Sequence, residues 1–353
     1  MVGLPARGKT YISKKLCRYL NWIGFKTKDS AHNPILDATN STLERRKKIQ
    51  NFAEDNGYKL FFIESICTDN KIVDSNIREV KLKSPDYEGR EPKEIMDDFL
   101  QRIEHYVENY VPLNDIAEPD IRYIKLINAG ESIEIVRHEG PVQSRIIYYL
   151  MSLQLLPRDI YLTRHGESEC NIHNIIGGDC DISPQGEKYA DALFEFFENM
   201  NIPDLRVFTS RLKRTIQTAK RFTCIQERWE ALNEINVVSS NTEAIRHIEC
   251  GNTGICDGMT INEINEKYPE LFDNRYNNKF HFRYPDGESY QDVIGRLETV
   301  IMELERESNI LVVTHAAIIR CLLGYFLDIP SGINFQYFSV LYTKLVIYAT
   351  ILK

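Results

Sequence analysis

The sequence predicts two α/β domains, each built around a mainly parallel β-sheet. Its 353 residues are 43% hydrophobic and 27% charged, which supplies apolar material for two compact cores and fits one core poorly. Short apolar runs alternate with helical patterns throughout, as in folds whose parallel strands are joined by helices. The elements form two such units in order, so we expect domains at residues 1–156 and 157–353.

The first domain is expected to contain one early helix and three strands. Apolar runs predict the strands at residues 35–36, 60–63 and 123–127. The helix before them is predicted by apolar residues at helical spacing: Ile12, Leu16, Leu20 and Ile23.

The second domain is expected to begin with a strand at residues 160–162. Ser183 and Pro184 are typical of an N-cap and a first helical turn, so a helix is expected to follow them. Further strands are expected at residues 205–208 and 310–313. The helix before the last strand is predicted by its apolar face: Val293, Ile294, Leu297, Val300, Ile301 and Leu304.

Charge and composition limit the partners. A net charge of -8 argues against a surface for nucleic acid or an anionic membrane, so any anion site must be concentrated in a few basic residues. The eight cysteines form no C-x-x-C pair and no zinc spacing, and we expect free, reduced thiols. Without a signal peptide or an apolar run of membrane-spanning length, the expected location is the cytoplasm.

Residues suited to phosphate chemistry follow three predicted strands of the second domain. Arg164-His165 follows the first strand, residues 210–214 follow the second, and Thr314-His315 follow the third. Ligands of open α/β sheets bind at the carboxyl ends of the strands, so we expect these clusters to converge on one anion.

Each residue type has a task in phosphoryl transfer. His165 can attack phosphorus as a neutral imidazole and carry the phosphoryl group. Arg164 and Arg214 can bind its oxygens bidentately, and His315 would add a positively charged donor. The leaving alkoxide needs an acid, for which Glu234 is the candidate.

The first domain carries a second phosphate motif. Gly3 and Gly8 begin and close the pattern G-x-x-x-x-G-K-[ST], which continues with Lys9 and Thr10. In such a P-loop, backbone N–H groups cradle phosphates, the lysine reaches the β- and γ-oxygens, and the threonine binds magnesium. Asp37 follows a predicted strand and is the candidate acidic residue at the metal.

The motifs of the second domain resemble one superfamily. Residues 164–167 are followed by Asn171, by Gln217-Thr218-Ala219 and by the stretch 285–289, Pro-Asp-Gly-Glu-Ser. This combination resembles the histidine phosphatase superfamily, whose fold is phosphoglycerate mutase-like. The resemblance implies that His165 is phosphorylated and that Glu234 donates the proton.

A P-loop joined to a histidine phosphatase resembles the bifunctional 6-phosphofructo-2-kinase/fructose-2,6-bisphosphatase family. The resemblance implies an incomplete P-loop kinase-type parallel sheet, followed by a phosphoglycerate mutase-like histidine phosphatase sheet. It also implies hydrolysis of the C2 phosphate of fructose 2,6-bisphosphate. The motifs that carry it cover most of the chain: residues 3–10, 37–40, 62–65, 84–87, 143–145, 176–179 and 284–290.

The resemblance further implies ligands and their contacts. The kinase half would bind ATP, Mg²⁺ and fructose 6-phosphate, the phosphatase would need no cofactor, and a homodimer would form through the N-terminal half. The implied kinase residues are Thr10 and Asp37 for the metal, Lys9, Asn76 and Lys81 for the nucleotide, and Arg102 and Tyr106 for the sugar. The implied phosphatase substrate contacts are Asn171, Gly177, Arg275, Lys279, Arg283 and Arg320.

The sequence departs from the family in both halves. Only Met1 and Val2 precede Gly3, and a long family segment is missing between Lys28 and Ile35, so we expect an impaired kinase. In the phosphatase half, residues 236–251 are an insertion after Glu234, which either extrudes as a loop or displaces that residue.

Three substitutions are expected to weaken sugar or phosphate contacts: Ile175, Ile261 and Ala316 stand where the family often has arginine, tyrosine and glutamine. Three interpretations therefore stay open. The chain is a fructose-2,6-bisphosphatase, a broader sugar-phosphate phosphatase, or an impaired member that binds phosphometabolites or pairs with a full-length homologue.

Overall fold

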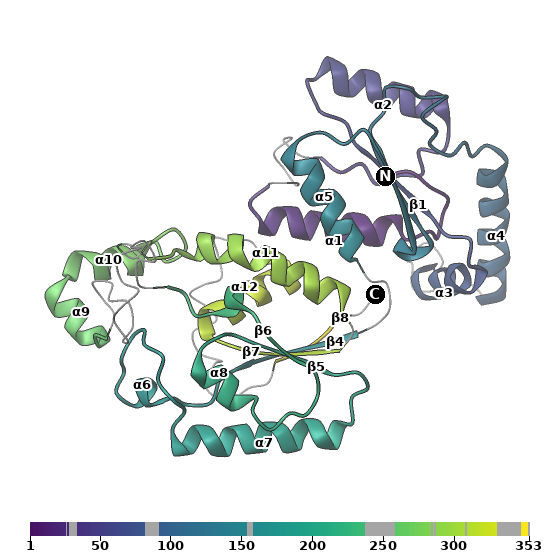
Figure 1. Cartoon of the computed structure of the whole chain (residues 1–353). Helices are drawn as coiled ribbons and strands as arrows, with labels where there is room; N and C mark the ends of the chain where they lie inside the picture. Colours follow the sequence, from purple (N-terminus) through teal and green to yellow (C-terminus); the bar gives the residue numbers. More distant parts are fainter. Residues whose placement is uncertain are drawn as a thin grey trace. The chain divides into compact units, whose positions relative to one another are not determined.

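The computed structural model describes residues 1–25, 27, 34–81, 92–153, 158–236, 258–283, 285, 287–307, 309–329 and 347–351. The chain divides into two compact units, Met1–Leu155 and Leu156–Lys353 (Figure 1). Each unit is described by itself.

The first unit contains a three-stranded sheet. Strands β1 (Phe62–Ile66) and β2 (Tyr123–Ile127) are parallel, and β3 (Ser132–Val136) runs antiparallel to β2 at one edge. The predicted strand at residues 123–127 is confirmed, and the strand expected at 60–63 begins two residues later than predicted.

The predicted strand at residues 35–36 is wrong. These residues form no ladder, and the carbonyl of Leu36 accepts a hydrogen bond from the terminal amine of Met1 at 2.8 Å. Val2 makes an isolated parallel bridge with Glu64 instead of a regular strand. Two residues, whether 35–36 or Met1 and Val2, make too few ladder hydrogen bonds to form a strand of ordinary length.

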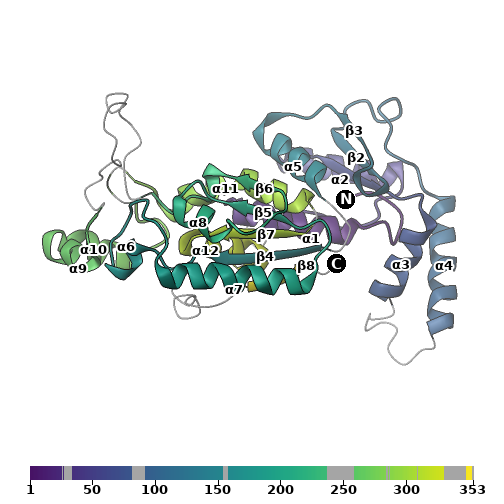
Figure 2. The ribbon, with the colours of Figure 1, turned by 60° about the horizontal axis from the view of Figure 1, so that its bottom comes forward.

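Helix α1 (Lys9–Trp22) confirms the predicted early helix. It buries Ile12, Leu16 and Leu20, and its Tyr19 stacks on Tyr149 with ring centroids 4.3 Å apart. The other described helices are α2 (Leu43–Asp55), α3 (Asn70–Lys81), α4 (Pro92–Glu108), the 3-10 turn η2 (Asn128–Gly130) and α5 (Gly140–Ser152). Helices α3 and α4 lie side by side (Figure 2) and share an apolar cluster that includes Ile77 and Phe99.

The second unit contains a five-stranded sheet in the order β6-β5-β7-β4-β8. Four of its strands are parallel, and β8 pairs antiparallel with β4. The strands are β4 (Arg158–Arg164), β5 (Arg206–Thr209), β6 (Gln226–Arg228), β7 (Ile310–Thr314) and β8 (Ile347–Ile351). The α/β class and the strands predicted near residues 160, 205 and 310 are confirmed.

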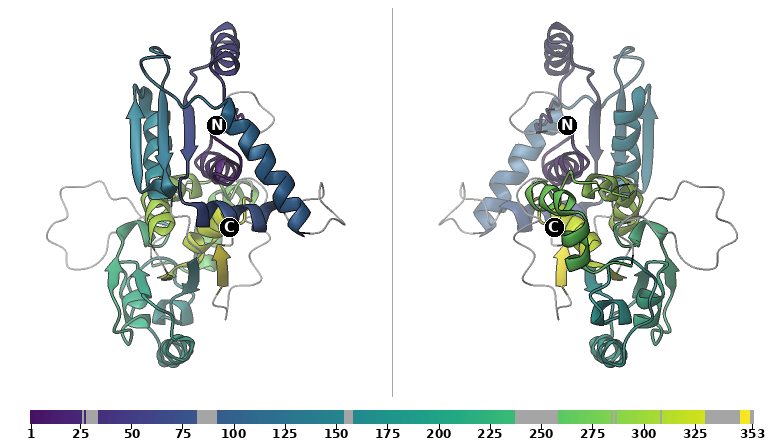
Figure 3. Two further views of the ribbon diagram at one scale, coloured as in Figure 1. Left: turned by 90° about the vertical axis from the view of Figure 1, so that its right-hand side faces the viewer. Right: turned by 90° about the vertical axis from the view of Figure 1, so that its left-hand side faces the viewer.

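Helices cover both faces of this sheet. Helix α7 (Pro184–Met200) lies on one face, and α11 (Tyr290–Arg306) and α12 (Ala316–Phe326) lie on the other (Figures 1 and 3). Ser183 caps α7 by accepting a hydrogen bond from Gly186 N, as its residue type predicts. Because both faces are covered, all five residues of β7 are buried.

Shorter elements complete the second unit. They are α6 (Glu169–Ile172), α8 (Lys213–Thr218), the 3-10 turn η3 (Glu230–Leu232), α9 (Ile261–Lys267) and α10 (Pro269–Asn277). Helix α8 follows the carboxyl end of β5, and η3 follows that of β6. Among the helices that the structure describes, none has the length and the hydropathy needed to cross a bilayer.

Candidate active site

Three strands of the second sheet end at one place. Strands β4, β5 and β7 are followed directly by His165, Ser210 and His315. The backbone N–H of His165 donates to Thr314 O at 3.0 Å, and the rings of His165 and His315 are 5.1 Å apart. Ser210 Oγ lies 2.9 Å from His315 Nε2. The structure therefore brings together side chains that are 150 residues apart in the sequence.

The turn after β4 leaves no room for a side chain at Gly166. A Cβ atom at this position would lie 2.6 Å from the carbonyl oxygen of Gly186, at the start of α7. The N–H of Gly166 donates to Thr218 Oγ1 in α8 at 2.9 Å. Glycine is thus required here because two backbones approach closely, and this approach holds His165 in place.

His165 is held in one tautomer. Its Nδ1 lies 2.6 Å from Gly166 O, and because a carbonyl only accepts, Nδ1 must carry the proton. Burial lowers the pKa of His165 to about 3, and the charges of Arg214 and Arg164 act in the same direction. The imidazole is therefore neutral, and its lone pair is on Nε2.

Two guanidinium groups face this imidazole. Arg214 is 6% exposed and donates from Nη1 to Gly178 O at 2.9 Å. Burial lowers its pKa, which the charges of Glu234 and Asp179 oppose. Within the described ranges, the buried Nε of Arg164 has no hydrogen-bond partner. Buried donors of this kind are costly unless a ligand satisfies them.

The charge of His315 is determined by its burial. Its side chain is fully buried, and burial lowers its pKa well below the usual range, helped by Arg214 and His165. Its Nδ1 is buried and has no partner in the described part of the chain. Without an anion His315 is therefore neutral, because burial among cations disfavours another cation, and the positive charge expected around a bound anion stays a prediction.

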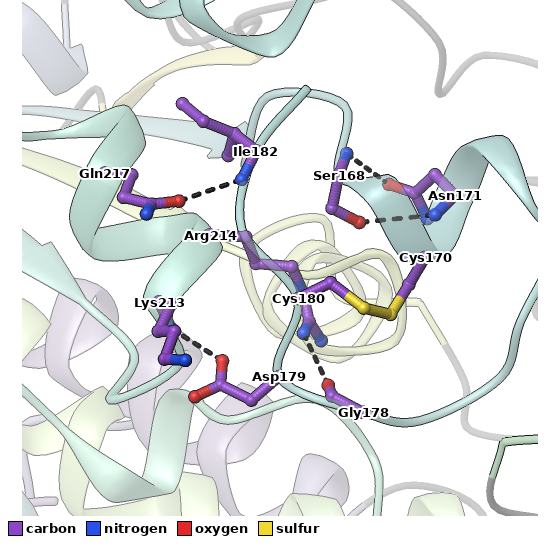
Figure 4. Close-up of a disulfide and its surroundings, with 10 residues drawn as sticks. All are labelled: Ser168, Cys170, Asn171, Gly178, Asp179, Cys180, Ile182, Lys213, Arg214 and Gln217. Carbon is purple, nitrogen blue, oxygen red and sulfur yellow. Dashed lines mark hydrogen bonds between the residues drawn. A yellow bond between two sulfur atoms is a disulfide. The ribbon is translucent and has the colours of Figure 1, made fainter. Parts of the chain in front are cut away.

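A loop between β4 and α7 borders the cluster (Figure 4). Gly178 O accepts from Arg214, and Asp179 accepts from the backbone N–H of Lys213 at 2.7 Å. At the start of the loop, Ser168 and Asn171 form the capping box of α6. Gly177, a predicted contact, lies in the turn beside Gly178, and both have positive φ.

A disulfide closes this loop (Figure 4). Cys170 and Cys180 are bonded, with Cα atoms 5.8 Å apart, so the expectation that every cysteine is a free thiol is wrong for this pair. The two cysteines are 10 residues apart, which is not the spacing of a metal site. They meet only because the loop turns back on itself. Gly178 packs against the disulfide, since a Cβ atom at Gly178 would lie 3.2 Å from Cys170 Sγ.

Glu234 lies beside the same cluster. It follows η3, and its charge raises the pKa of Arg214, which indicates that the two side chains are close. Thr314 Oγ1 donates to Leu232 O at 2.8 Å, and Arg211 N donates to Asn233 Oδ1 at 2.9 Å. The segment before the insertion is therefore attached to the ends of β7 and β5. Residues 237–257, which hold most of the insertion, lie outside the described residues.

The predicted sugar contacts lie in several environments. Arg320 donates to the hydroxyl of Tyr290 at 3.0 Å, and Arg283 pairs with Asp292 at the start of α11. Lys279 follows α10 and is half-buried. The side chain of Arg275 lies outside the described residues, as does that of Ile261.

Sequence reasoning missed several residues of the site. Ser210 contacts His315, and Tyr290 is a buried phenol whose pKa burial raises to about 12. Arg296 and Glu288 contact the Glu234 segment. The position of Tyr290, directly after the motif at residues 285–289, was a usable signal; Arg296 had none, because it lies within an ordinary helical pattern.

The P-loop motif of the first unit forms the turn that opens α1. Gly3 approaches Ser65 so closely that a Cβ would lie 2.5 Å from its carbonyl oxygen. Asn76 donates to Ala6 O at 3.1 Å, so this predicted nucleotide residue does lie against the loop. Lys9 is buried and donates to Leu4 O at 2.7 Å.

The remaining predicted kinase residues differ in their exposure to solvent. The side chains of Thr10 and Asp37 are exposed, and Tyr106 is half-buried on α4. The side chains of Lys81 and Arg102 lie outside the described residues.

Two family models match the chain. One, described as 6-phosphofructo-2-kinase, matches residues 1–33 and 27–157, and one described as histidine phosphatase superfamily (branch 1) matches residues 160–350. The chain is 45% identical over 377 residues to the 6-phosphofructo-2-kinase/fructose-2,6-bisphosphatase of Aquarana catesbeiana, covering 93% of this chain and 77% of the relative. It is 44% identical over 377 residues, with the same coverage, to the 6-phosphofructo-2-kinase/fructose-2,6-bisphosphatase 4 of Homo sapiens.

Solved structures are similar to part of the chain. Bacillus stearothermophilus YhfR is 25% identical with a TM-score of 0.44, over 54% of this chain and 89% of its own. The alpha-ribazole phosphatase from Shigella flexneri is 21% identical with a TM-score of 0.41, over 49% and 81%.

Reducing the disulfide is expected to destabilise the second unit. A bond that closes a loop of this length contributes about 2 to 3 kcal/mol by limiting the unfolded chain. Urea unfolding in the presence and absence of dithiothreitol measures this. The chain has two tryptophans, so Trp22→Phe leaves Trp229 as the reporter of the second unit. The matched variant Cys180→Ala should not respond to dithiothreitol; an equal response in both proteins would contradict the prediction.

The buried neutral His165 is expected to make the second unit acid-sensitive. In the unfolded chain its pKa is 6.5, so as the pH falls the unfolded state binds a proton that the native state, with a pKa of about 3, does not. Stability is therefore lost as the pH falls below about 6.5. The loss between pH 7 and pH 5 should be about 2 kcal/mol smaller in His165→Asn.

The same urea series at both pH values measures this difference. His173→Asn, which removes an exposed histidine, should behave like the wild type. The same pH dependence in His165→Asn and the wild type would show that His165 is not held neutral by burial.

Proposed function

Because the chain belongs to the 6-phosphofructo-2-kinase/fructose-2,6-bisphosphatase family, we propose that its second unit hydrolyses the C2 phosphate of fructose 2,6-bisphosphate through a phosphohistidine at His165. The observation that carries the proposal is the tautomer of His165. Its proton is committed to Gly166 O on Nδ1, which leaves the lone pair of Nε2 as the nucleophile. We assign residues 1–156 to a kinase-like domain and residues 157–353 to this phosphatase.

The first step transfers the phosphoryl group to the enzyme. Nε2 of His165 forms a bond to phosphorus while the bond from phosphorus to the C2 oxygen breaks. The C2 oxygen takes the proton of the Glu234 carboxyl group, which becomes a carboxylate. The products of this step are fructose 6-phosphate and phosphohistidine.

Water completes the cycle. It attacks phosphorus, the nitrogen–phosphorus bond breaks, and the Glu234 carboxylate takes a proton from the water. Inorganic phosphate leaves, and both His165 and Glu234 return to their initial protonation states. These steps need no cofactor.

The cationic cluster would hold the transferred phosphoryl group. Arg164 and Arg214 can bind its equatorial oxygens, and the unpartnered Nε of Arg164 supports this role. The buried Nδ1 of His315 is a second polar atom for the phosphate to satisfy. A bound dianion favours the protonated imidazole, so His315 would gain its positive charge only with the ligand.

The rest of the sugar phosphate would lie along the loop and the α11 side of the site. Asn171 and Gly177 contribute from the loop that Arg214 contacts. Arg320, beside Tyr290, is a candidate for the second phosphate, together with Arg275, Lys279 and Arg283. Ile175, Ile261 and Ala316 remove polar groups from the sugar side, which favours a raised KM over a lost nucleophile.

Two alternatives differ in what they need. A broader sugar-phosphate phosphatase would use the same His165 chemistry and is favoured if Ile175 and Ala316 loosen selectivity. An impaired member that acts as a binding partner is favoured by the shortened kinase half, and a displaced Glu234 would add to the impairment. The effect of Glu234 on the pKa of Arg214 supports the enzyme over this alternative.

We propose that the first unit is impaired as a 6-phosphofructo-2-kinase. The family match to this half comes in two pieces that meet at residues 27–33. The alignment with the A. catesbeiana relative spans 377 positions, although 93% of the 353 residues is only about 328, so about 49 of those positions have no counterpart here. A missing segment of this size at the predicted gap would remove part of the acceptor site.

The P-loop still has residues that suit ATP with Mg²⁺. The hydroxyl of Thr10 and the carboxylate of Asp37 are exposed oxygen ligands of the kind that Mg²⁺ prefers. The metal, when bound, would neutralise charge on the nucleotide phosphates. Lys9 directly follows the loop that would cradle them, and Asn76 of α3 lies against this loop.

Phosphoenzyme trapping tests the phosphatase. With fructose 2,6-bisphosphate labelled at the C2 phosphate, rapid quenching should trap one acid-labile phosphate on His165. His165→Ala should trap none, because its side chain offers no nitrogen to phosphorus. Mass spectrometry under alkaline conditions locates the label, and a labelled wild type that fails to release fructose 6-phosphate would contradict the proposed reaction.

A kinase assay tests the first unit. Transfer from ATP to fructose 6-phosphate should be about 100-fold or more slower than in the human relative assayed in parallel, because an incomplete acceptor site misplaces the attacking hydroxyl. His165→Ala in this chain, and alanine at the aligned position of the relative, prevent breakdown of the product. Equal rates would overturn the proposed impairment and leave the phosphatase proposal untouched.

A further inference from the structure

The proposed acid Glu234 is on a segment with little regular structure of its own. It lies two residues after the short turn η3, and Asn236, the first residue of the insertion, is the last one described before residue 258. A general acid must be held within hydrogen-bond reach of the oxygen that it protonates. Some other part of the molecule must therefore fix this segment.

Arg296 of α11 binds the backbone of this segment. Its Nη2 donates to Asn233 O at 2.8 Å and to Glu234 O at 3.3 Å, and its Nη1 donates to Ala231 O. Three carbonyl groups of this segment, that of Glu234 itself and two that precede it, thus converge on one guanidinium group. Backbone carbonyls of an irregular segment have no ladder partner, so these bonds replace secondary structure.

Glu288 holds both Arg296 and the segment. Its carboxylate makes a bidentate pair with Arg296, with Nε–Oε1 at 2.8 Å and Nη2–Oε2 at 3.1 Å. The same Oε2 accepts from Asn236 N at 2.8 Å, and Glu288 N donates to Asn236 O at 2.7 Å. Glu234 therefore lies between two points of attachment, and the second is Asn236, the first residue of the insertion.

Both residues are on a rigid support. Glu288 directly precedes Ser289, which caps α11, and Arg296 lies in the second turn of that helix. The helix is anchored by buried residues that include Val293 and Leu297, both 0% exposed. A side chain on a packed helix holds its partners more accurately than one on a loop.

We propose that Arg296 and Glu288 are positioning residues that hold Glu234 in place for proton transfer and keep the insertion from displacing it. The inference rests on the proposed role of Glu234. The planar guanidinium group is essential to it, because one group must reach three carbonyls and two carboxylate oxygens at fixed angles. A lysine, with a single nitrogen, cannot do this.

Varying the leaving group distinguishes a residue that positions the acid from one that has only a structural role. An acid matters when the leaving oxygen is basic, as in an alkoxide or phenolate, and matters little for p-nitrophenolate, which departs unprotonated. Single-turnover phosphoenzyme formation is therefore measured for fructose 2,6-bisphosphate, phenyl phosphate and p-nitrophenyl phosphate. The proteins are the full-length wild type, Arg296→Lys, Glu288→Gln and the benchmark Glu234→Gln.

Arg296→Lys should slow the reaction of fructose 2,6-bisphosphate and of phenyl phosphate by about 100-fold, following Glu234→Gln. The rate with p-nitrophenyl phosphate should change by less than about threefold, because nucleophile and phosphate site are intact. Glu288→Gln should show the same pattern with a smaller loss, since its amide oxygen can still accept from Asn236 N.

Arg158→Lys is the matched control. Arg158 makes a buried pair with Glu305 at 2.6 Å, at the opposite end of β4 from His165. It should lower the melting temperature and affect all three substrates equally. If Arg296→Lys does not fold, the rates of Glu288→Gln relative to the wild type on the same three substrates decide the test.

Equal losses on all substrates in the Arg296 and Glu288 variants, or no loss on phenyl phosphate, would overturn the inference. A wild type that reacts with the aryl phosphates but not with fructose 2,6-bisphosphate would overturn the proposed substrate alone. The aryl series would then still decide whether Arg296 and Glu288 position the acid.

Discussion

The parallel pairing of β4 with β7 is the constraint on which the phosphatase site depends. Its register places Arg164 opposite Thr314, so the next residues, His165 and His315, leave the sheet side by side. A slip of one residue would turn one of them to the other face of the sheet. Complete burial of β7 between helices opposes such a slip, because it would require another packing of every residue in the strand.

Burial sets the chemistry at this edge of the sheet. It keeps His165 neutral, so its lone pair is available, and it lowers the pKa of Arg214, which lies with Arg164 in the same cluster. Such a cluster is costly in a free protein, because buried charges and orphan donors lose their hydration. A bound phosphate group would offset this cost, so a protein with a net charge of -8 can still contain a site suited to an anion.

Glu234 depends on a different kind of support from His165. The proposed nucleophile is fixed by strand pairing and by the contact of Gly166 with Gly186, whereas the proposed acid is held by side chains of α11 that bind its backbone. Attachment on both sides of Glu234 separates it mechanically from the residues that follow Asn236. The molecule can therefore accommodate an insertion at this position, since Glu288 holds the first residue of that insertion, Asn236.

The sequence by itself determined the α/β class, most strands of both sheets, and the residue types of the two phosphate motifs. Periodicity and local turn chemistry carry that information, because they act between near neighbours in the chain. Only the tertiary structure decided that residues 35–36 form no strand, that Cys170 meets Cys180, that His315 is uncharged, and that Arg296 binds the Glu234 segment. Each of these depends on which groups, distant in the sequence, come close in space and on how much water they exclude. The spacing of residues along the chain determines neither.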